Sequence, residues 1–150
     1  GHKYAAGLTI DRDNIAEFKT FLNTIARANF KNESLSPVLE VDAQIPLSLI
    51  DEKLFRDIDR LSPYGEGNRR PIFVSRNLVV KSKPQIVGKN SLKFWVSDGE
   101  LTFEAIGFGM SDFFGMANEA RPIDLAYCIG RDDWNSQDLI QLEIKDIKPS

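Results

Sequence analysis

The stretch PIFVSRNLVVKSKPQIVGKNSLKFWVSDGELTFEAIGF, residues 71–108, decides the fold. Runs of β-branched and aromatic residues alternate in it with polar residues, which predicts strands near 71–81, 91–98 and 100–108. The dipeptide Asp98-Gly99 predicts a tight turn between the last two of these strands. Residues Gln85 to Gly88 would add one more strand if they pair with a neighbour.

The pattern continues with a short helix near 111–118 and two strands near 123–130 and 137–147. Five strands with a helix between the third and the fourth is the order of the OB fold, a small Greek-key barrel that binds oligonucleotides and oligosaccharides. We therefore expect an α+β, mainly β fold: a five-stranded OB-fold barrel preceded by a strand and a helix.

The strand and the helix before the barrel have clear signals. Strict alternation predicts a half-buried strand with one apolar face, made of Leu39, Val41, Ala43 and Ile45. Ser48 is the predicted N-cap of a helix that ends before Pro63. The buried stripe of that helix consists of Ile50, Leu54, Ile58 and Leu61.

A second amphipathic helix is predicted upstream. It begins at Asn14, which forms a capping-box pattern with Glu17, and it extends to about Asn29. Its apolar stripe consists of Ile15, Phe18, Leu22 and Ile25. Residues 8–10 indicate a short strand end, and the polar segment 31–36 indicates a linker, so the chain divides into residues 1–36 and 37–150.

Composition excludes several classes of protein. The chain has 150 residues, 42% of them hydrophobic, which suits one domain, or one domain with a small appendage, and allows a proper core. It contains no apolar run of the roughly 20 residues that cross a bilayer, and its start does not resemble a signal peptide. A single cysteine excludes an internal disulfide, so we expect a cytoplasmic protein with no membrane partner.

The net charge of −3 hides a segregation of charge along the sequence. Residues 69–97 contain no Asp or Glu, and they contain seven cations: Arg69, Arg70, Arg76, Lys81, Lys83, Lys89 and Lys93. That segment therefore carries +7 and the rest of the chain carries −10. A solvated face would explain a short basic run, but the complete absence of acids over this length favours an anionic partner.

Period-two alternation in residues 91–98 puts Leu92, Phe94 and Val96 on the core side and Lys93 and Trp95 on the other. An exposed Trp beside a Lys is typical of single-strand binders, because the indole stacks on a base and the ammonium group neutralises a phosphate. The alternative is that Trp95 packs under one of the two predicted helices.

The preceding loop, residues 81–90, contains three lysines that would contact phosphates without sequence choice. Asn90 in this loop would either bond a base edge or serve in a turn. In the hairpin at residues 131–138, Trp134 is a second candidate for base stacking, with turn anchoring as the alternative.

The sequence contains no clear set of catalytic residues. His2 is the sole histidine, which argues against a multi-histidine metal site and a Ser-His-Asp triad. Cys128 alternates with strand residues and is predicted to be packed rather than nucleophilic. Asp98, Glu100 and Glu104 could be drawn as a cation site, but strand turns commonly carry such residues.

Several segments together resemble the C-terminal part of the RecJ family of single-strand-specific DNA exonucleases. They are GHKYAAG (1–7), LSPYGEGNRRPIF (61–73), IVGKNSLKFWVSD (86–98), EAIGFGM (104–110) and LIQLEIKDIKPS (139–150). The resemblance implies that residues 1–36 are the helical remnant of a DHH-associated domain and that residues 37–150 are a nucleic-acid-binding OB domain. It also implies that His2, with Gly1 beside it, contacts phosphate, although Gly1-His2 could instead be a vector remnant.

The resemblance further implies a parent enzyme that hydrolyses single-stranded DNA from the 5′ end in repair and recombination. Its divalent cation, Mn²⁺ or Mg²⁺, would be held by a missing N-terminal domain, so this fragment should have no cofactor and no activity. The expected nucleic-acid contacts are Gly1, His2, Arg69, Arg70, Arg76, Lys81, Lys83, Lys89, Asn90, Lys93 and Trp95.

Three functions are compatible with these features to different degrees. The first is binding of single-stranded DNA by a monomeric barrel, with a single-strand-binding protein as a further partner. The second is a protein-interaction module that docks an acidic partner, such as the tail of that single-strand-binding protein. The third, oligosaccharide binding, needs more exposed aromatic residues than the sequence supplies.

Overall fold

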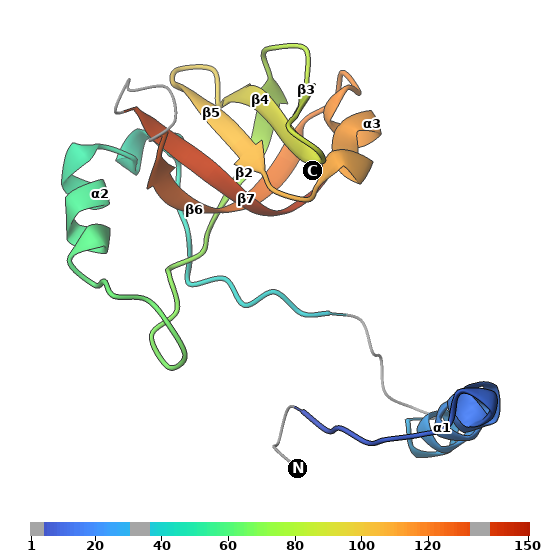
Figure 1. The fold of residues 1–150 in the computed structure, drawn as a ribbon. Helices are drawn as coiled ribbons and strands as arrows, with labels where there is room; N and C mark the ends of the chain where they lie inside the picture. Colours follow the sequence, from blue (N-terminus) through green and yellow to red (C-terminus); the bar gives the residue numbers. More distant parts are fainter. Residues whose placement is uncertain (1–4, 31–36, 133–138) are drawn as a thin grey trace. The chain divides into compact units, whose positions relative to one another are not determined.

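A computed structural model describes residues 5–30, 37–132 and 139–150 (Figure 1). The chain divides into two compact units, residues 1–38 and residues 39–150. No helix in the described residues is both long and apolar enough to cross a membrane.

The first unit contains one regular helix, α1 (Ile15–Asn29), preceded by the 3-10 helix η1 (Arg12–Asn14). The predicted helix is therefore confirmed, but its capping box is not: Asn14 already has helical dihedral angles and its side chain makes no cap bond. Residues 8–10 form no strand, which corrects that prediction. None of the residues of α1, all of them described, is buried within this unit, and Ile15, Leu22 and Ile25 are 41–50% exposed.

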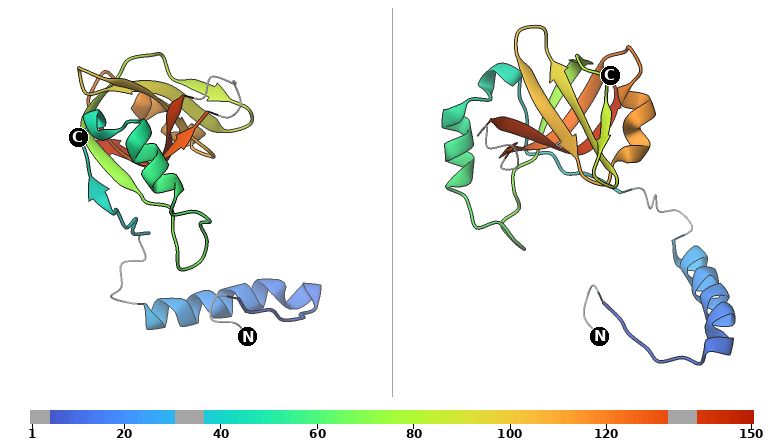
Figure 2. Two further views of the ribbon diagram at one scale, coloured as in Figure 1. Left: turned by 90° about the vertical axis from the view of Figure 1, so that its left-hand side faces the viewer. Right: turned by 45° about the horizontal axis from the view of Figure 1, so that its top comes forward.

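The second unit is a twisted sheet with helices on two sides of it (Figures 1 and 2). Its strands are β1 (Ala43–Gln44), β2 (Phe73–Val80), β3 (Gln85–Val87), β4 (Ser91–Ser97), β5 (Thr102–Gly107), β6 (Ile123–Arg131) and β7 (Ile140–Pro149). Its helices are η2 (Leu47–Leu49), α2 (Glu52–Asp59), η3 (Ser111–Phe113) and α3 (Phe114–Ala117). Helices α2 and α3 lie at opposite sides of the strands (Figure 2).

The sheet closes on itself. The strand order is β1-β2-β6-β7-β5-β4-β3, and an additional pairing of Val79 with Ser97 and Val80 with Val96 joins β2 to β4. The closed ring is therefore β2-β6-β7-β5-β4, in which β5 and β7 are parallel. This is the OB order that the sequence predicts, with α3 between the third and the fourth barrel strands. The segment at residues 85–87 does form an extra strand, β3, outside the ring.

The barrel interior is filled by the residues that alternation assigns to it. Leu92, Phe94 and Val96 are 0–1% exposed, and β6 is buried from Ile123 to Gly130. The interior also contains one polar pair: the hydroxyl groups of Ser75 and Tyr127 lie 2.7 Å apart, and Ser75 donates to the carbonyl of Ile45. Burial raises the pKa of Tyr127 to about 12, although the bond to Ser75 opposes the shift.

The strand predicted over 39–45 is reduced to β1, two residues that pair in parallel with the start of β2. Ala43 lies opposite Phe73, and the N–H of Ile72, which would continue the ladder towards residue 41, donates instead to the side chain of Asp42 at 2.8 Å. Leu39 and Val41 consequently remain about 40% exposed, whereas Ala43 and Ile45 pack against the core as predicted.

Helix α2 begins three residues later than the sequence suggests. Its N-cap is Asp51, whose Oδ1 accepts a hydrogen bond of 2.7 Å from the N–H of Leu54, and not Ser48. Ser48 lies in η2 instead, and Ile50 between the two helices has an extended backbone. Ile50 and Ile58 are buried as predicted, but Leu61 is 53% exposed because α2 ends at Asp59.

The cap assignment predicts different effects for two substitutions. Asp51→Ala leaves the N–H of Leu54 without its partner and should lower the free energy of unfolding by about 1 kcal/mol. Ser48→Ala, the matched control, should change it by less than about 0.5 kcal/mol. Urea denaturation followed by circular dichroism measures both, and a larger loss for Ser48→Ala would contradict the assignment.

Candidate nucleic-acid interface

The outer side of β4 and β5 carries side chains that point away from the core, and we call it the Trp95 face. On β4 it presents Lys93 and Trp95, which flank the buried Phe94. Trp95 is 38% exposed, so it is not buried under α2, which the packing alternative to base stacking would require. On β5 the register places Glu104 opposite Trp95 and Ile106 opposite Lys93.

The loop between β2 and β4 lies beside this face. The carbonyl of Trp95 accepts a 2.8 Å hydrogen bond from the N–H of Lys81, and its N–H donates to Ser82 Oγ at 3.0 Å. We call residues 81–90 the lysine loop; it includes β3, which pairs with β4. In OB folds the connection between the first two barrel strands forms one wall of the binding groove.

Three of the seven predicted cations belong to the lysine loop: Lys81, Lys83 and Lys89. All three are exposed, and within the described residues none of them has a carboxylate within ion-pair distance. Lys81 lies next to Trp95, whereas Lys83 precedes β3 and Lys89 lies in the turn between β3 and β4. The loop therefore presents three cations along β4 that no described carboxylate neutralises locally.

The other four cations have carboxylate partners. Two of these pairs are on the barrel surface near the Trp95 face: Lys93–Glu104 at 2.9 Å and Arg70–Glu143 at 2.9 Å. The remaining two pairs are Arg69–Glu40 at 3.3 Å and Arg76–Asp124 at 3.5 Å. The charge segregation in the sequence is thus partly cancelled in space, because distant segments, β5, β6 and β7 among them, supply the carboxylates.

Two hydrogen bonds anchor the side chain of Arg70 on the barrel, which gives it a structural role. Its guanidinium donates to the carbonyl of Ile129 at 2.6 Å as well as to Glu143, and it lies over Gly130. A Cβ at Gly130 would lie 3.0 Å from Arg70 Nη2, so glycine permits this close approach. Any phosphate contact by Arg70 would be made by a group that already holds the 64–70 segment on the barrel.

The YGEGN segment forms a compact turn. The side-chain amide of Asn68 donates to the carbonyls of Leu61 and Pro63, at 2.8 and 2.9 Å, and Gly67 has a positive φ of 81°. Tyr64 donates to the carbonyl of Ile58 at the end of α2. These contacts give the segment a structural role: it joins α2 to β2 and positions Arg69 and Arg70.

The remaining sequence candidates have mostly structural contacts. Asn90 is exposed, and its carbonyl accepts from the N–H of Ser111, so its backbone serves a turn while its side chain stays accessible. Asp98 Oδ1 accepts from the N–H groups of Leu101 and Glu100, and these backbone bonds lower the pKa of Asp98. No cluster of three or more metal-ligating side chains is present in the described parts of the chain.

Three predicted residues fall outside the described residues: Gly1, His2 and Trp134. Cys128 is 1% exposed and burial raises its pKa, so it is a packed residue, as the sequence indicates.

One exposed aromatic residue of the described part of the barrel, Phe108, was not identified from the sequence. Phe108 is 63% exposed immediately after β5, at the end of the β4–β5 pair where Leu92 lies opposite Gly107. The sequence does contain a signal for Phe108. Alternation along 102–108 places Phe108 on the same side of the strand as Glu104, whereas the buried Ala105 is on the other side.

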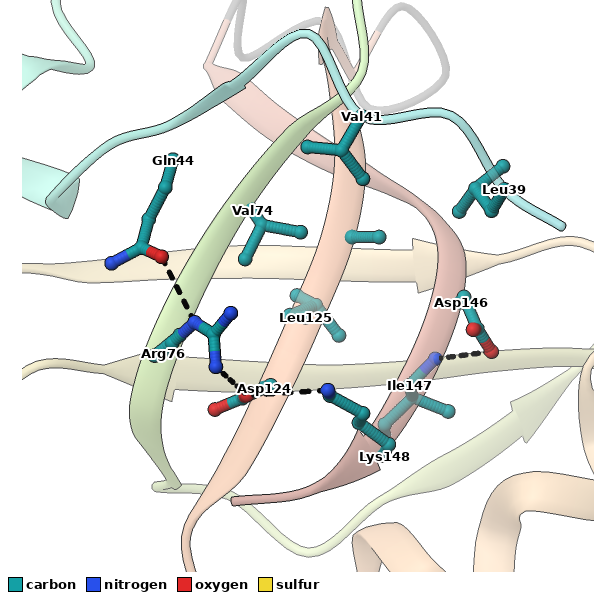
Figure 3. Close-up of a pocket in the computed structure, with 11 residues that line it drawn as sticks. Leu39, Val41, Gln44, Val74, Arg76, Asp124, Leu125, Asp146, Ile147 and Lys148 are labelled. Atoms are coloured by element: carbon teal, nitrogen blue, oxygen red, sulfur yellow. Dashed lines mark hydrogen bonds and ion pairs between the residues drawn. The ribbon is translucent and has the colours of Figure 1, made fainter.

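A second concave surface lies on another side of the barrel, over β2, β6 and β7 (Figure 3). We call it the Asp124 groove; its volume is about 310 Å³. Leu39 and Val41 form an apolar wall, and Val74 and Ile147 lie on the neighbouring strands. At its lower end in Figure 3, Arg76 and Lys148 flank the carboxylate of Asp124.

Asp124 itself has a structural function. Its carboxylate accepts hydrogen bonds from Ser150 Oγ at 2.5 Å and from the N–H of Asn77 at 3.2 Å. Burial alone would raise the pKa of Asp124, but these bonds and the cations Arg76 and Lys148 outweigh burial and lower it. The Asp124 carboxylate is 6% exposed while Arg76 and Lys148 are 53% and 63% exposed, so the charged groups that the groove presents to solvent are these two cations and the exposed Asp146.

The closed ring β2-β6-β7-β5-β4, with the lysine loop between its first two strands, defines this unit as an OB-fold barrel. A family model described as the RecJ OB domain matches residues 41–146. The chain belongs to this family, which confirms the predicted resemblance.

Similar proteins agree with this assignment. The RecJ single-stranded-DNA-specific exonuclease of Bacillus subtilis is 26% identical over 97% of this chain, which covers 19% of that protein. The Haemophilus influenzae RecJ exonuclease is 22% identical over 99% of the chain and is covered to 26%. The crystal structure of Thermus thermophilus RecJ with Mn²⁺ has a TM-score of 0.69 at 22% identity, over all of this chain and 21% of that chain. The chain thus spans about a fifth to a quarter of the length of these relatives.

The environment of Asp124 predicts a pH-dependent contribution to stability. Because the folded-state pKa is lowered, the stabilisation is complete above the ordinary carboxyl pKa of about 4 and is lost as the pH falls through the folded-state value. Asp124→Asn should therefore cost about 1–3 kcal/mol at pH 7, and the difference from the unsubstituted protein should narrow as the pH falls below about 4.

Asp146→Asn is the matched control for this substitution. Asp146 lines the same groove but is exposed, and its carboxylate accepts from the neighbouring N–H of Ile147. We expect less than about 0.5 kcal/mol for this change at any pH. Guanidinium denaturation at a series of pH values makes the comparison, and equal effects of the two variants would refute the role of Asp124.

Proposed function

We propose that the barrel binds single-stranded DNA as one part of a 5′→3′ single-strand-specific DNA exonuclease. The observation that carries the proposal is the lysine loop: its three exposed lysines lack local ion pairs in the described residues and are spread along β4, with Lys81 beside the partly exposed Trp95. A sequence-tolerant single-strand binder combines such cations with aromatic stacking surfaces.

The two kinds of contact would serve different parts of the strand. The ammonium groups of the lysine loop would neutralise phosphates, and the indole of Trp95 would stack on a base. Phe108, just after the strand that pairs with the Trp95 strand, offers a second aromatic surface for a base further along the DNA. This division gives affinity without sequence choice in the phosphate contacts.

We further propose that the whole enzyme acts in DNA repair and recombination in the cytoplasm. The relatives that the chain matches are named single-stranded-DNA-specific exonucleases, and Thermus RecJ has been crystallised with Mn²⁺ and with Mg²⁺. A divalent cation would then be bound by another domain of the enzyme, and the barrel, as a monomer, would deliver the strand to that site.

Residues 1–36 would belong to a DHH-associated domain. The exposed apolar residues of α1, among them Phe21, Leu22 and Ile25, support this proposal, since a helix with such a stripe needs a partner to cover it. The same domain would supply the phosphate contact implied for His2.

Neutralising the lysine loop should weaken DNA binding in a salt-dependent manner. Replacing Lys81, Lys83 and Lys89 with Gln removes three phosphate contacts, which should reduce the slope of log K against log salt by about 2. At about 0.1 M salt the affinity for oligo-dT should fall on the order of 100-fold. Fluorescence anisotropy over a series of salt concentrations measures both quantities.

The matched control removes three cations from α2 and its C-cap: Lys53, Arg56 and Arg60, each replaced with Gln. This variant has the same change in net charge and should keep the slope and lose little affinity. Equal weakening by the two variants would show that net charge, and not the lysine loop, controls binding, and it would overturn the proposed surface.

A second candidate function, docking of an acidic peptide, is favoured by the Asp124 groove. The groove combines an apolar wall at Leu39 and Val41 with the exposed cationic groups of Arg76 and Lys148. A peptide with carboxylates next to an aromatic side chain, such as the tail of a single-strand-binding protein, has matching chemistry. This surface is separate from the Trp95 face, so both partners could be bound together.

Lys148→Glu tests this docking surface. The substitution should weaken binding of a labelled peptide rich in Asp and Phe by at least about tenfold, since one attraction becomes a repulsion. Oligo-dT binding should not change, and oligo-dT should not displace the peptide. Lys53→Glu is the control, and displacement of the peptide by DNA would place the peptide on the lysine loop instead.

A further inference from the structure

One carboxylate lies in the middle of the Trp95 face. Glu104 on β5 is 15% exposed, and its two oxygens have different partners. Oε2 pairs with Lys93 Nζ at 2.9 Å, and Oε1 accepts from Gln141 Nε2 at 2.5 Å. These contacts fix the position of the carboxylate, and the charge of Lys93 is paired with it.

Glu104 is also the nearest cross-strand neighbour of Trp95. The N–H and carbonyl of Trp95 bond to Ser82 and Lys81, on the side away from β5. Trp95 and Glu104 are therefore a non-hydrogen-bonded pair of antiparallel strands, the type in which the Cα atoms approach to about 4.5 Å and side chains are closest. A base stacked on the indole would consequently present one edge to the Glu104 carboxylate.

An ionised carboxylate distinguishes bases by the groups on that edge. It accepts hydrogen bonds only, with about four lone-pair positions, and Lys93 and Gln141 use two of them. Cytosine offers an amino group at its 4-position, whereas thymine has a carbonyl oxygen at the same place. The carboxylate attracts the first and repels the second, although the two rings stack equally well in size and shape.

We propose that Glu104 is a specificity residue that selects, at the position stacked on Trp95, a base with an exocyclic amino group, and so prefers cytosine to thymine. The inference rests on the proposed function, because it requires single-stranded DNA on the Trp95 face. It adds a base preference to a surface whose lysine loop has none. Lys93 is then a positioning residue that holds the carboxylate, and not a phosphate contact.

The test compares the affinities of the whole chain for oligo-dC and oligo-dT of equal length near neutral pH, by fluorescence anisotropy at one salt concentration. We expect oligo-dC to bind about fivefold more tightly than oligo-dT. Glu104→Gln should reduce the ratio to below about twofold, because an amide offers both a donor and an acceptor and pairs with either base. Trp95→Ala should weaken both oligonucleotides and remove the preference.

Two further variants make the result specific. Glu100→Gln has the same change in charge at an exposed position near the β4–β5 turn, and it should keep the fivefold ratio. Lys93→Gln removes the ion pair that holds the carboxylate, so it should lower the ratio of the two affinities to about two- to threefold, and it tests the inference if Glu104→Gln is poorly folded by its melting temperature. An equal loss of affinity for both oligonucleotides, with the ratio unchanged, would show that Lys93 contacts phosphate and would overturn its positioning role.

The failures of the two proposals are distinguishable. Equal binding of oligo-dC and oligo-dT by the unsubstituted protein, or a ratio that Glu104→Gln leaves unchanged, would overturn the role of Glu104 while the proposed function stands. Absence of binding to either oligonucleotide would overturn the proposed function and this inference with it.

Discussion

The barrel depends on a change of partner halfway along β2. This strand pairs with β6 from Phe73 to Leu78 and with β4 at Val79 and Val80, and the ladder is interrupted between Ser75 and Leu78. At the interruption Asn77 has a positive φ of 55°, a conformation that asparagine adopts more readily than most residues. Its N–H has no strand partner there, and Asp124 and Ser150 accept from it instead. The buried carboxylate on β6 therefore stabilises the point at which β2 changes partner.

Closure also decides what the barrel presents to solvent. Once β2 reaches β4, the connection between them passes beside Trp95 and is held there by the backbone N–H of Lys81 and the hydroxyl of Ser82. The parallel pairing of β5 with β7 places Gln141 next to Glu104, and the carboxylate pairs with Lys93 on the next strand. The same geometry that completes the hydrogen-bond ladders thus separates the cations paired with carboxylates, on β2 and β4 and in the segment before β2, from those of the lysine loop, which have no carboxylate partner in the described residues.

Much of the fold was predictable because its signals are local. Alternation in 91–98, the Asp98-Gly99 turn and the apolar stripe of α1 identify strands, hairpin and helix without reference to the rest of the chain. The predictions were wrong where contacts with another segment of the chain decide the local structure. The strand at 39–45 shrinks to two residues because the Asp42 side chain accepts from the N–H of Ile72 that would continue the ladder. The cap of α2 moves to Asp51 because η2 includes Ser48.

The candidate site shows the same division. The sequence by itself determined the barrel order, the Lys93 and Trp95 side of β4 and the basic stretch at 69–97, since periodicity and local charge are properties of neighbouring residues. Only the tertiary structure decided which cations are available to a ligand: four of the seven meet carboxylates from distant segments, and the three in the lysine loop meet none in the described residues. The physical reason is that ion pairs form between side chains close in space, and the sheet brings together strands that lie far apart along the chain.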